Sequence, residues 1–376
     1  MRPIQMVDLK KQYHHISDEI NKAVLDVLES SAFINGPAVH EFSENLAAYL
    51  GVKHVIPCAN GTDALQIAMM ALGLKPGDEV ITPSFTYIAT TEVVALLRLK
   101  PVFAEVDKQG FCLDPEQLEK AITPRTKAIV PVHLYGQPAP MEEILSIAEK
   151  HGLHVIEDNA QAIGAMYHFE NGKSSKTGSI GHIGTTSFFP SKNLGAYGDG
   201  GAISTNDDQL AEKMRMIANH GQQKRYYHDM VGCNSRLDSI QAAILKIKLE
   251  KLDAYIEARR AVADYYDQAF EASEKIKTPW RAPYGKHVFH QYTLQLENVD
   301  RDGLQKFLAE KNIPSMIYYP VPGHRQKMFD TLDNETVDLP VTDWLTKRVI
   351  SLPIHTEMDK DQLAYITQSV LEYVHN

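Results

Sequence analysis

The chain has 376 residues, of which 44% are hydrophobic and 23% charged, so its length suits two or three domains of ordinary globular composition. A formal net charge of −10 disfavours a nucleic-acid partner but still allows a local basic pocket for a small anion. The three scattered cysteines suit neither a disulfide framework nor a metal site, and neither a signal peptide nor a membrane-spanning run is found. We therefore expect a cytoplasmic protein that binds no metal and no membrane.

The first half of the chain predicts helices followed by alternating strands and helices. Apolar residues recur at helical spacing over 17–30 and again over 38–50. Short apolar strands are then predicted at 54–58, 79–82, 101–106, 127–132 and 153–157, with helices at 63–72, 90–97, 114–121 and 141–151. This alternation predicts a buried, mostly parallel sheet flanked by helices.

The second half predicts the end of this sheet and a smaller domain. A hairpin or excursion is expected at 165–176, where a polar insert begins at Glu170, and further strands at 185–189 and 202–205. One long helical pattern covers 237–270, and we place the domain boundary within it. Residues 1–245 then form a large α/β domain, and 246–376 form a small α+β domain with strands at 288–296 and 314–319 and helices at 302–311 and 360–374.

The stretch from Gly184 to Gly201 carries the most chemical information. Pro190 ends its strand pattern, since proline cannot donate to a ladder, and this places Lys192 on a loop at a strand end. The glycines that follow would let the backbone pass close to a flat group. Such a lysine suits an imine with a carbonyl, and pyridoxal phosphate (PLP) is the usual protein-bound carbonyl. The ordinary alternative is a solvated surface lysine.

Two further motifs stand between strands and helices. Gly61 and Thr62 open a predicted helix, whose N-terminus could hold a phosphate. Asp158 ends a buried strand, where its carboxylate could keep a pyridine ring protonated, and Gln161 could bond the phenolic oxygen of that ring. Taken singly, each of these residues could equally be part of an ordinary helix cap.

Aromatic and basic residues complete the candidate set. Tyr87 follows a predicted strand and could stack on a flat cofactor, although a core aromatic is as common there. Ser187 could donate to a phosphate. A basic loop at 220–227 and the segment Asn234-Ser235-Arg236 suit a diphosphate or a carboxylate, because arginine binds both with two hydrogen bonds. A solvated run of charge is the alternative.

Taken in order, these features resemble the fold-type I PLP-dependent transferases, and more narrowly the DegT/DnrJ/EryC1/StrS sugar-nucleotide aminotransferases. The likeness covers nearly the whole chain and rests on the motifs CANGTDAL, GDEVITPSFTYIAT, VIEDNAQAIGA, TSFFPSKNLGAYGDGGAI and NSRLD. Within the family, CANGTDALQIA, TSFFPSKNLG and HGQQKRYYH are most similar to enzymes that aminate a UDP-linked 3-keto-2-acetamido hexuronic acid. Tyr318 departs from the histidine that some uronate-using relatives have at this position.

The resemblance implies a homodimer with active sites at its interface, PLP as cofactor with pyridoxamine phosphate as an intermediate form, glutamate as amino donor and a nucleotide sugar as acceptor. It also implies a role in bacterial surface polysaccharide biosynthesis, such as that of a lipopolysaccharide O-antigen. Lys192 would bond the cofactor aldehyde, and Asp158 would pair with the pyridine nitrogen. The implied cofactor contacts are Gly61, Thr62, Tyr87, Asp158, Gln161, Ser187, Lys192 and, from the neighbouring protomer, Asn234. The expected substrate contacts are Arg225, Arg236, Tyr318 and His324.

Three alternative functions differ in chemistry. Some relatives are PLP-dependent dehydratases in which histidine replaces the lysine, so Lys192 favours transamination. A non-catalytic regulator of the same fold could sense a sugar nucleotide, but Lys192, Asp158 and Gln161 argue against it. A dinucleotide-binding enzyme would rest on the glycine spacing at 178–184, which does not open a βαβ unit.

Overall fold

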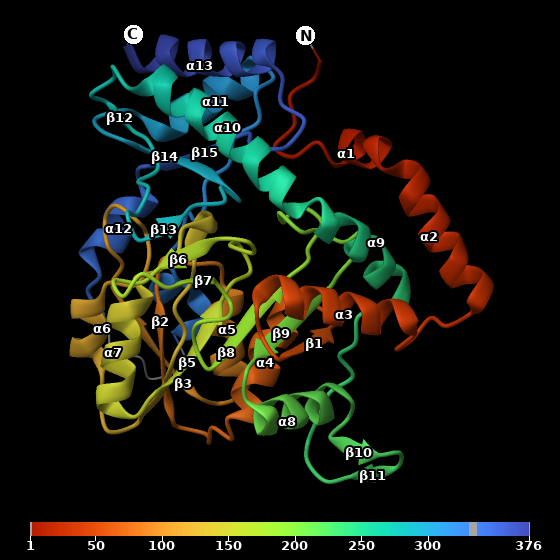
Figure 1. Cartoon of the computed structure of the whole chain (residues 1–376). Helices are drawn as coiled ribbons and strands as arrows, with labels where there is room; N and C mark the ends of the chain where they lie inside the picture. The colour runs from red at the N-terminus through yellow and green to blue at the C-terminus, as the bar shows by residue number, and fades with distance from the viewer. Residues whose placement is uncertain (1, 331–336, 376) are drawn as a thin grey trace.

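The computed structural model describes residues 2–330 and 337–375, and a seven-stranded sheet lies at the centre of its larger part (Figure 1). In spatial order its strands are β1 (His54–Cys58), β9 (Gly201–Thr205), β8 (Ile183–Ser187), β5 (His154–Asp158), β4 (Thr126–Ile129), β2 (Glu79–Pro83) and β3 (Lys100–Ala104). Neighbouring strands from β8 to β3 are parallel, whereas β9 runs antiparallel to both β8 and β1. The carboxyl ends of β1 and of the parallel strands therefore meet at one edge, and the predicted mostly parallel sheet is confirmed.

Helices bury both faces of this sheet, because its strands are apolar at consecutive positions. One layer contains α4 (Gly61–Ala71), α5 (Ala89–Leu96) and α8 (Asp208–Ala218), and the other contains α3 (Pro37–Leu50), α6 (Pro115–Ala121), α7 (Met141–His151) and α9 (Ser239–Glu250). Successive side chains of a strand point to opposite faces, so Ile156 packs in the α4 layer and Val155 in the α7 layer.

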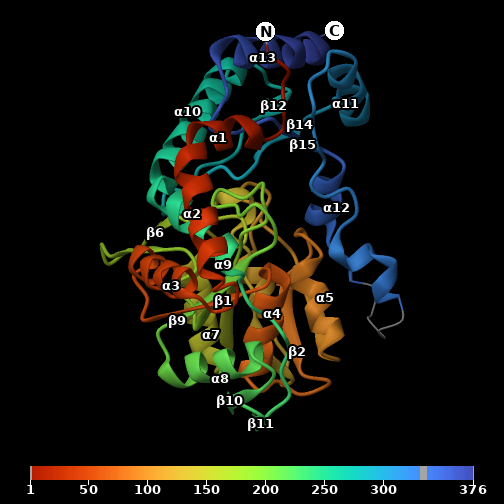
Figure 2. The same cartoon turned by 90° about the vertical axis from the view of Figure 1, so that its right-hand side faces the viewer.

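A second core forms around a three-stranded antiparallel sheet. Its strands are β12 (Ile276–Lys277), β14 (Tyr292–Leu296) and β15 (Val349–Leu352), and they pack with α10 (Leu252–Phe270), α11 (Arg301–Glu310) and α13 (Lys360–His375). The N-terminal end of the chain joins this core, since Ile4 packs within it and Arg2 Nη2 lies 2.9 Å from Asp359 Oδ2. From there α1 (Leu9–His15) and α2 (Ser17–Ser30) lead back to α9, against which α2 packs (Figure 2).

Three details differ from the predicted elements. The single predicted helix over 237–270 is two helices, α9 and α10, with Lys251 between them, so a boundary after residue 245 falls inside α9. No strand forms over 314–319, where Met316 makes one isolated bridge to Ser351. Prolines at both ends of that segment remove ladder donors and leave little backbone able to pair.

The polar insert is a hairpin, one of the two predicted outcomes. β6 (Met166–His168) pairs with β7 (Ser174–Lys176), and β13 (Gly285–Lys286) adds a third strand. The amide of Glu170 donates to Glu142 Oε2 on α7 at 3.0 Å, so the hairpin lies against α7. The remaining elements are β10 (Gln222–Lys224), β11 (Tyr227–His228) and α12 (Pro340–Thr346). Over the described ranges, no helix combines the length and apolarity needed to cross a membrane.

Candidate active site

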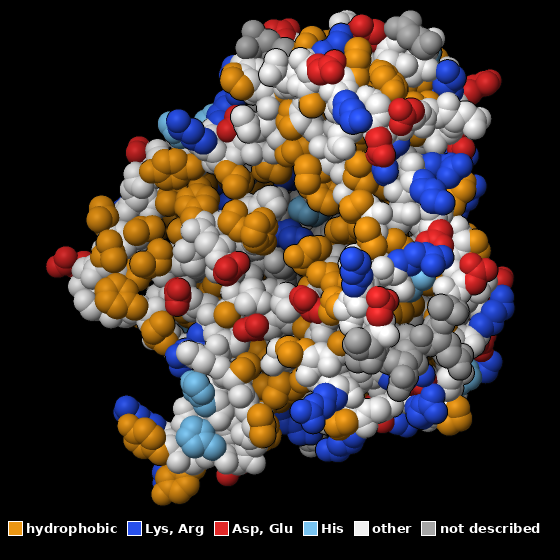
Figure 3. All heavy atoms as spheres, turned by 180° about the vertical axis from the view of Figure 1, so that it is seen from behind, with side chains coloured by type: hydrophobic (Ala, Val, Ile, Leu, Met, Phe, Trp, Pro, Cys, Tyr) orange, Lys and Arg blue, Asp and Glu red, His pale blue; other side chains and the backbone are white. Residues whose placement is uncertain are grey.

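The predicted chemical groups converge at the edge of the sheet where the parallel strands end. Asp158 is the last residue of β5, Ser187 is the last residue of β8, and Gly61 opens α4 just after β1. Asp158 is paired in register with Thr185 of β8, which brings the two strand ends together. Seen from behind, the surface between the two domains is hollowed, and a Lys or Arg and a His side chain lie at its bottom among hydrophobic side chains (Figure 3).

The N-terminus of α4 forms a cradle that only glycine permits. Asn60 caps the helix by accepting a hydrogen bond from the amide of Asp63 at 2.8 Å. A Cβ atom on Gly61 would lie 2.7 Å from Ser187 Cβ, so these two residues are in direct contact. The first amides of a helix have no partner within it, and the Ser187 hydroxyl lies beside them. An anion of phosphate size fits this set of donors.

Asp158 is held by two neutral donors. Only 6% of the residue is exposed. Its Oδ1 accepts from the amide of Ala160 at 3.1 Å, and its Oδ2 accepts from Thr90 Oγ1, on α5, at 2.8 Å. Because both oxygens are engaged, the carboxylate is fixed in one orientation.

Lys192 lies on a tight turn that follows β8. Its amide donates to the carbonyl of Phe189 at 2.9 Å, and a Cβ atom on Gly195 would lie 2.2 Å from the carbonyl oxygen of Pro190, so the loop folds back closely on itself. Burial lowers the pKa of the Lys192 ammonium to about 8, while the negative charge of Asp158 opposes this shift. A depressed pKa makes the neutral, nucleophilic amine accessible near neutral pH.

The orientation of the Gln161 amide follows from its neighbours. The backbone amide of Tyr135, which has a φ of +57°, donates to Gln161 Oε1 at 2.8 Å. Gln161 Nε2 in turn donates to the hydroxyl of Tyr319 at 3.0 Å, which leaves its second proton for another acceptor. A phenolic oxygen is a suitable acceptor, as predicted for Gln161.

Two tyrosines stand beside this amide. Tyr87 is 57% exposed, so a ring face is available for stacking, and its ring centroid lies 6.1 Å from that of Tyr319. Tyr319 was not among the predicted site residues. The sequence contains the adjacent pair Tyr318-Tyr319, and only the backbone conformation decides which ring turns towards Gln161.

Tyr318 and His324 differ in their surroundings. The backbone carbonyl of Tyr318 accepts from the hydroxyl of Tyr135, whose amide bonds Gln161, and the Tyr318 side chain is half-buried. His324 Nδ1 lies 2.7 Å from Ser84 Oγ, His324 Nε2 lies 3.5 Å from Asp343 Oδ1, and the side chain is 3% exposed. The imidazole is therefore buried and bonded to Ser84, just after β2, and would have to leave this position to touch a substrate. A substrate contact by either residue stays a prediction.

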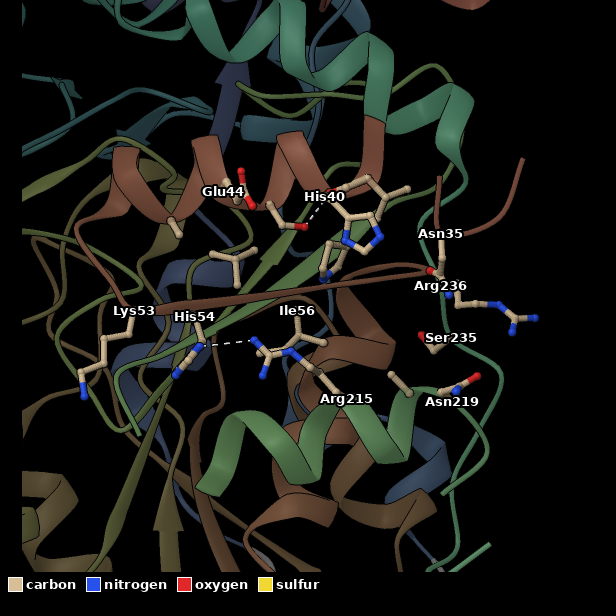
Figure 4. A pocket seen from close by; sticks show the side chains of 16 residues that line it. Asn35, His40, Glu44, Lys53, His54, Ile56, Arg215, Asn219, Ser235 and Arg236 are labelled. Atoms are coloured by element: carbon tan, nitrogen blue, oxygen red, sulfur yellow. Dashed lines mark hydrogen bonds between the residues drawn. The ribbon is translucent and has the colours of Figure 1, made fainter. Parts of the chain in front are cut away.

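The basic candidates lie on the β10–β11 hairpin and on the segment before α9. Arg225 is exposed on the β10–β11 hairpin, which projects from the body of the molecule, and its guanidinium lies over the ring of Tyr226 (Figure 1). Asn234 is exposed as well. Arg236 borders a cavity of about 640 Å3 between α3, β1 and α8, with Asn35 and Ser235 beside it (Figure 4). Ser235 accepts from the amide of Ala59 at 3.0 Å and donates to Asp63 Oδ2 at 2.6 Å, so this segment lies beside the start of α4.

The convergent residues suit PLP. The α4 amides and Ser187 provide donors for its phosphate, Tyr87 offers a face for its ring, and Asp158 offers a carboxylate for its pyridine nitrogen. Lys192 supplies an amine of lowered pKa for its aldehyde. Because Gly61 packs directly against Ser187, the start of α4 and the Ser187 hydroxyl lie side by side at the phosphate end.

Comparisons with known proteins agree with this assignment. Residues 14–371 match the model of the DegT/DnrJ/EryC1/StrS aminotransferase family. A pleiotropic regulatory protein of Geobacillus stearothermophilus is 47% identical over 98% of both chains. The UDP-2-acetamido-2-deoxy-3-oxo-D-glucuronate aminotransferase of Pseudomonas aeruginosa is also 47% identical, over 96% of this chain and 98% of its own.

A solved structure extends the similarity to three dimensions. The crystal structure of S. venezuelae DesV in complex with a ketimine intermediate superimposes with a TM-score of 0.95. The two sequences are 39% identical, and the match covers 100% of each chain. The similarity therefore includes both domains.

Proposed function

Because the chain belongs to the DegT/DnrJ/EryC1/StrS aminotransferase family and is a PLP-dependent aminotransferase, we propose that it acts on a UDP-linked keto sugar. The amino group comes from L-glutamate, and the acceptor is the keto carbon of UDP-2-acetamido-2-deoxy-3-keto-glucuronic acid. The 47% identity to the P. aeruginosa aminotransferase supports this substrate. The placement of Lys192 and Asp158 at neighbouring strand ends, around one cradle, is the observation that carries the chemistry.

In this proposal the residues of the site have different tasks. When bound, PLP supplies an aldehyde for the amino group and a ring that accepts the electrons left by a broken C–H bond. Lys192 Nζ would hold the aldehyde carbon and would also act as the base that moves a proton. Asp158 holds a negative charge at the ring nitrogen, and the N-terminus of α4 holds the phosphate.

The proposed substrate contacts come from a second copy of the chain. Arg225 and Arg236 would bind the diphosphate or the sugar carboxylate with paired hydrogen bonds, and Asn234 would reach the phosphate of the neighbouring site. The helix α2 and the β10–β11 hairpin lie on the same side of the molecule (Figure 2), and large apolar side chains are exposed on α2, just after it, and on the hairpin. They are Leu25, Leu28, Phe33, Ile34, Tyr226 and Tyr227, and their exposed fractions are 44–76%. Burial of such a surface favours a homodimer.

A product of this kind would enter bacterial surface polysaccharide biosynthesis in the cytoplasm, for example on the way to a lipopolysaccharide O-antigen. That role rests on the proposed substrate. A diacetamido uronic acid linked to UDP is an activated sugar, which a glycosyltransferase could use.

The test is incubation of the holoenzyme with 15N-glutamate and a panel of UDP-linked 3-keto sugars, followed by product NMR. The panel pairs the 2-acetamido-3-keto-glucuronate with the matching 3-keto-glucose, which lacks the C6 carboxylate. We expect 15N at C3 of the uronate and a lower kcat/KM for the neutral sugar. Faster amination of the neutral sugar would contradict the uronate assignment, and loss of water without 15N would indicate a dehydratase.

A second candidate is a non-catalytic regulator that senses a sugar nucleotide. The regulatory name of the G. stearothermophilus relative favours it. Lys192 argues against it, because a sensor needs no amine of lowered pKa beside a carboxylate. A visible absorption band that shifts when glutamate is added, with release of 2-oxoglutarate, supports the enzyme, and binding of the sugar nucleotide without this change supports the regulator.

A further inference from the structure

A hydrogen-bonded pair of threonines stands behind Asp158. Thr90 Oγ1 lies 2.8 Å from Asp158 Oδ2 and 3.2 Å from Thr86 Oγ1. Thr90 is fully buried and Thr86 is 6% exposed. A hydroxyl has one proton, and an ionised carboxylate can only accept. Thr90 must therefore give its proton to Asp158, and Thr86 must be the donor to Thr90.

This arrangement is unusual for a threonine at the start of a helix. Threonines there normally bond amides or carbonyls of their own turn, and Thr91 does so, with its Oγ1 donating to the carbonyl of Ile88 at 3.1 Å. Thr90 instead crosses from α5 to a strand end 68 positions away in sequence. Thr91 thus makes a local hydrogen bond, whereas its neighbour Thr90 makes a long-range one.

The side chain that donates to Asp158 Oδ2 is the neutral hydroxyl of Thr90, and this affects the charge of the site. Within the described part of the chain, no Lys, Arg or His nitrogen lies within 4.0 Å of an Asp158 oxygen. A buried carboxylate must be hydrogen-bonded, but an adjacent cation would cancel the charge that a protonated ring needs. A hydroxyl satisfies the carboxylate and leaves its full negative charge for the ring.

We propose that Thr90, with Thr86 behind it, is a positioning residue that holds the Asp158 carboxylate aimed at the pyridine nitrogen. Hydrogen bonds in such a chain polarise one another, so Thr86 strengthens the contact that Thr90 makes. Thr90 acts on the cofactor through Asp158 alone. The inference rests on the proposed pairing of Asp158 with the ring nitrogen.

The experiment compares T90V, which keeps the shape but loses the hydroxyl, with T90S, which keeps the hydroxyl. T91V is the matched control, because it removes a buried hydroxyl one position away that bonds only its own turn. Each holoprotein is loaded with PLP labelled with 15N in the ring, and the nitrogen chemical shift reports protonation directly. The dissociation constant of PLP and kcat are measured on the same samples.

We expect T90V to move the ring-nitrogen signal towards the unprotonated position and to lower kcat by about 10- to 100-fold, the usual effect of losing a hydrogen bond to a charged group. T90S should restore both readouts, and T91V should match the wild type in both. T86V should give a smaller change in the same direction, and it serves as the test if T90V does not fold.

The outcomes separate this inference from the proposed function. A wild-type nitrogen shift in T90V or T86V, alongside an unprotonated ring in D158N, would overturn the role of Thr90 and leave that of Asp158 intact. An unprotonated ring in the wild type would overturn both. Equal losses in T90V and T90S would also overturn the inference, because they would indicate a packing effect without a role for the hydroxyl.

Discussion

The predicted site has two parts, and they differ in how complete they are. One part lies around Lys192, and the other lies on the β10–β11 hairpin. Around Lys192, a Cβ atom on Gly61 would meet Ser187 Cβ at 2.7 Å, and Asp158 is 6% exposed. On the hairpin, Arg225 is exposed beside Tyr226, which is 76% exposed. Folding of one chain therefore brings most of the cofactor centre together, with only Asn234 proposed to come from a second copy, whereas the groups proposed for the sugar nucleotide still lack an opposite surface.

The largest effect on turnover should come from a change at Lys192, in the cofactor centre. K192A should lower turnover by at least about 10³-fold, because it removes both the covalent amine and the proton carrier. Borohydride reduction followed by peptide mass spectrometry should label Lys192 in the wild type and no lysine of the variant. K192R is the control, since it keeps a cation without the nucleophile and should be equally inactive. Turnover and a visible imine band in K192A would refute the assignment.

A smaller loss of turnover is expected when the carboxylate of Asp158 is removed. D158N should reduce kcat by about 10²- to 10³-fold, the typical effect of removing one preorganised electrostatic contact. Both half-reactions should slow alike, because each breaks a C–H bond next to the ring. Stopped-flow absorbance with glutamate, and separately with the keto sugar, measures the two. Asparagine keeps the shape, and its Oδ1 can still accept from Ala160 while its Nδ2 donates to the Thr90 hydroxyl, so the fold should hold. A half-reaction that keeps its wild-type rate would contradict the role.

The exposed hairpin should affect substrate binding more than chemistry. R225A should raise the KM for the sugar nucleotide by about tenfold or more and change kcat little, as expected for the loss of one charge-assisted hydrogen bond. K224A is the matched control, because Lys224 lies in the same hairpin over the ring of Tyr227. An unchanged KM in R225A would remove Arg225 from the site.

Mixed dimers test whether the two regions belong to different protomers. Protomers of K192A are mixed with protomers of the double variant R225A/N234A. Each variant alone should be poorly active at a low substrate concentration. Random pairing makes half of the dimers hybrid with one intact site each, so activity should recover to about a quarter of the wild-type value. No recovery, with hybrid dimers verified by native mass spectrometry, would mean that each protomer has a self-contained site.

The smallest expected effect is a shift in the pH dependence of imine formation by Lys192. Burial lowers the pKa of Lys192 to about 8, so roughly a tenth of the amine is neutral at pH 7, against less than about 0.1% for an exposed lysine. The rate of imine formation by the apoprotein should rise with pH and level off above about 8. Because Asp158 opposes the shift, D158N should move this midpoint lower. A midpoint near that of an exposed lysine would show that Lys192 is solvated.

Residues at strand ends were the ones that sequence reasoning could identify. A strand pattern that stops at Pro190 places Lys192 just beyond β8, and a buried strand that ends at Asp158 places that carboxylate on the same edge. Gly61 follows from the same rule, since it opens the helix after β1. These residues carry local signals, because strand direction and helix starts are encoded by short-range pattern.

The sequence contains no local pattern that predicts contacts between distant segments. Thr90 and Asp158 are 68 positions apart, and nothing in either neighbourhood announces their hydrogen bond. The contact of His324 with Ser84 had no sequence signal, and its predicted substrate contact stays a prediction. The hydrogen bond between Gln161 and Tyr319 was likewise not predicted.

The amino-acid sequence alone determined the family, the mostly parallel sheet and the cofactor, and it led to the prediction that Lys192 binds this cofactor, because these follow from ordered local motifs. The tertiary structure alone decided how Asp158 is held, which way the Gln161 amide points and which tyrosine stands beside it. Those features depend on side chains that different elements bring within hydrogen-bonding distance, and such distances exist only once the chain has packed.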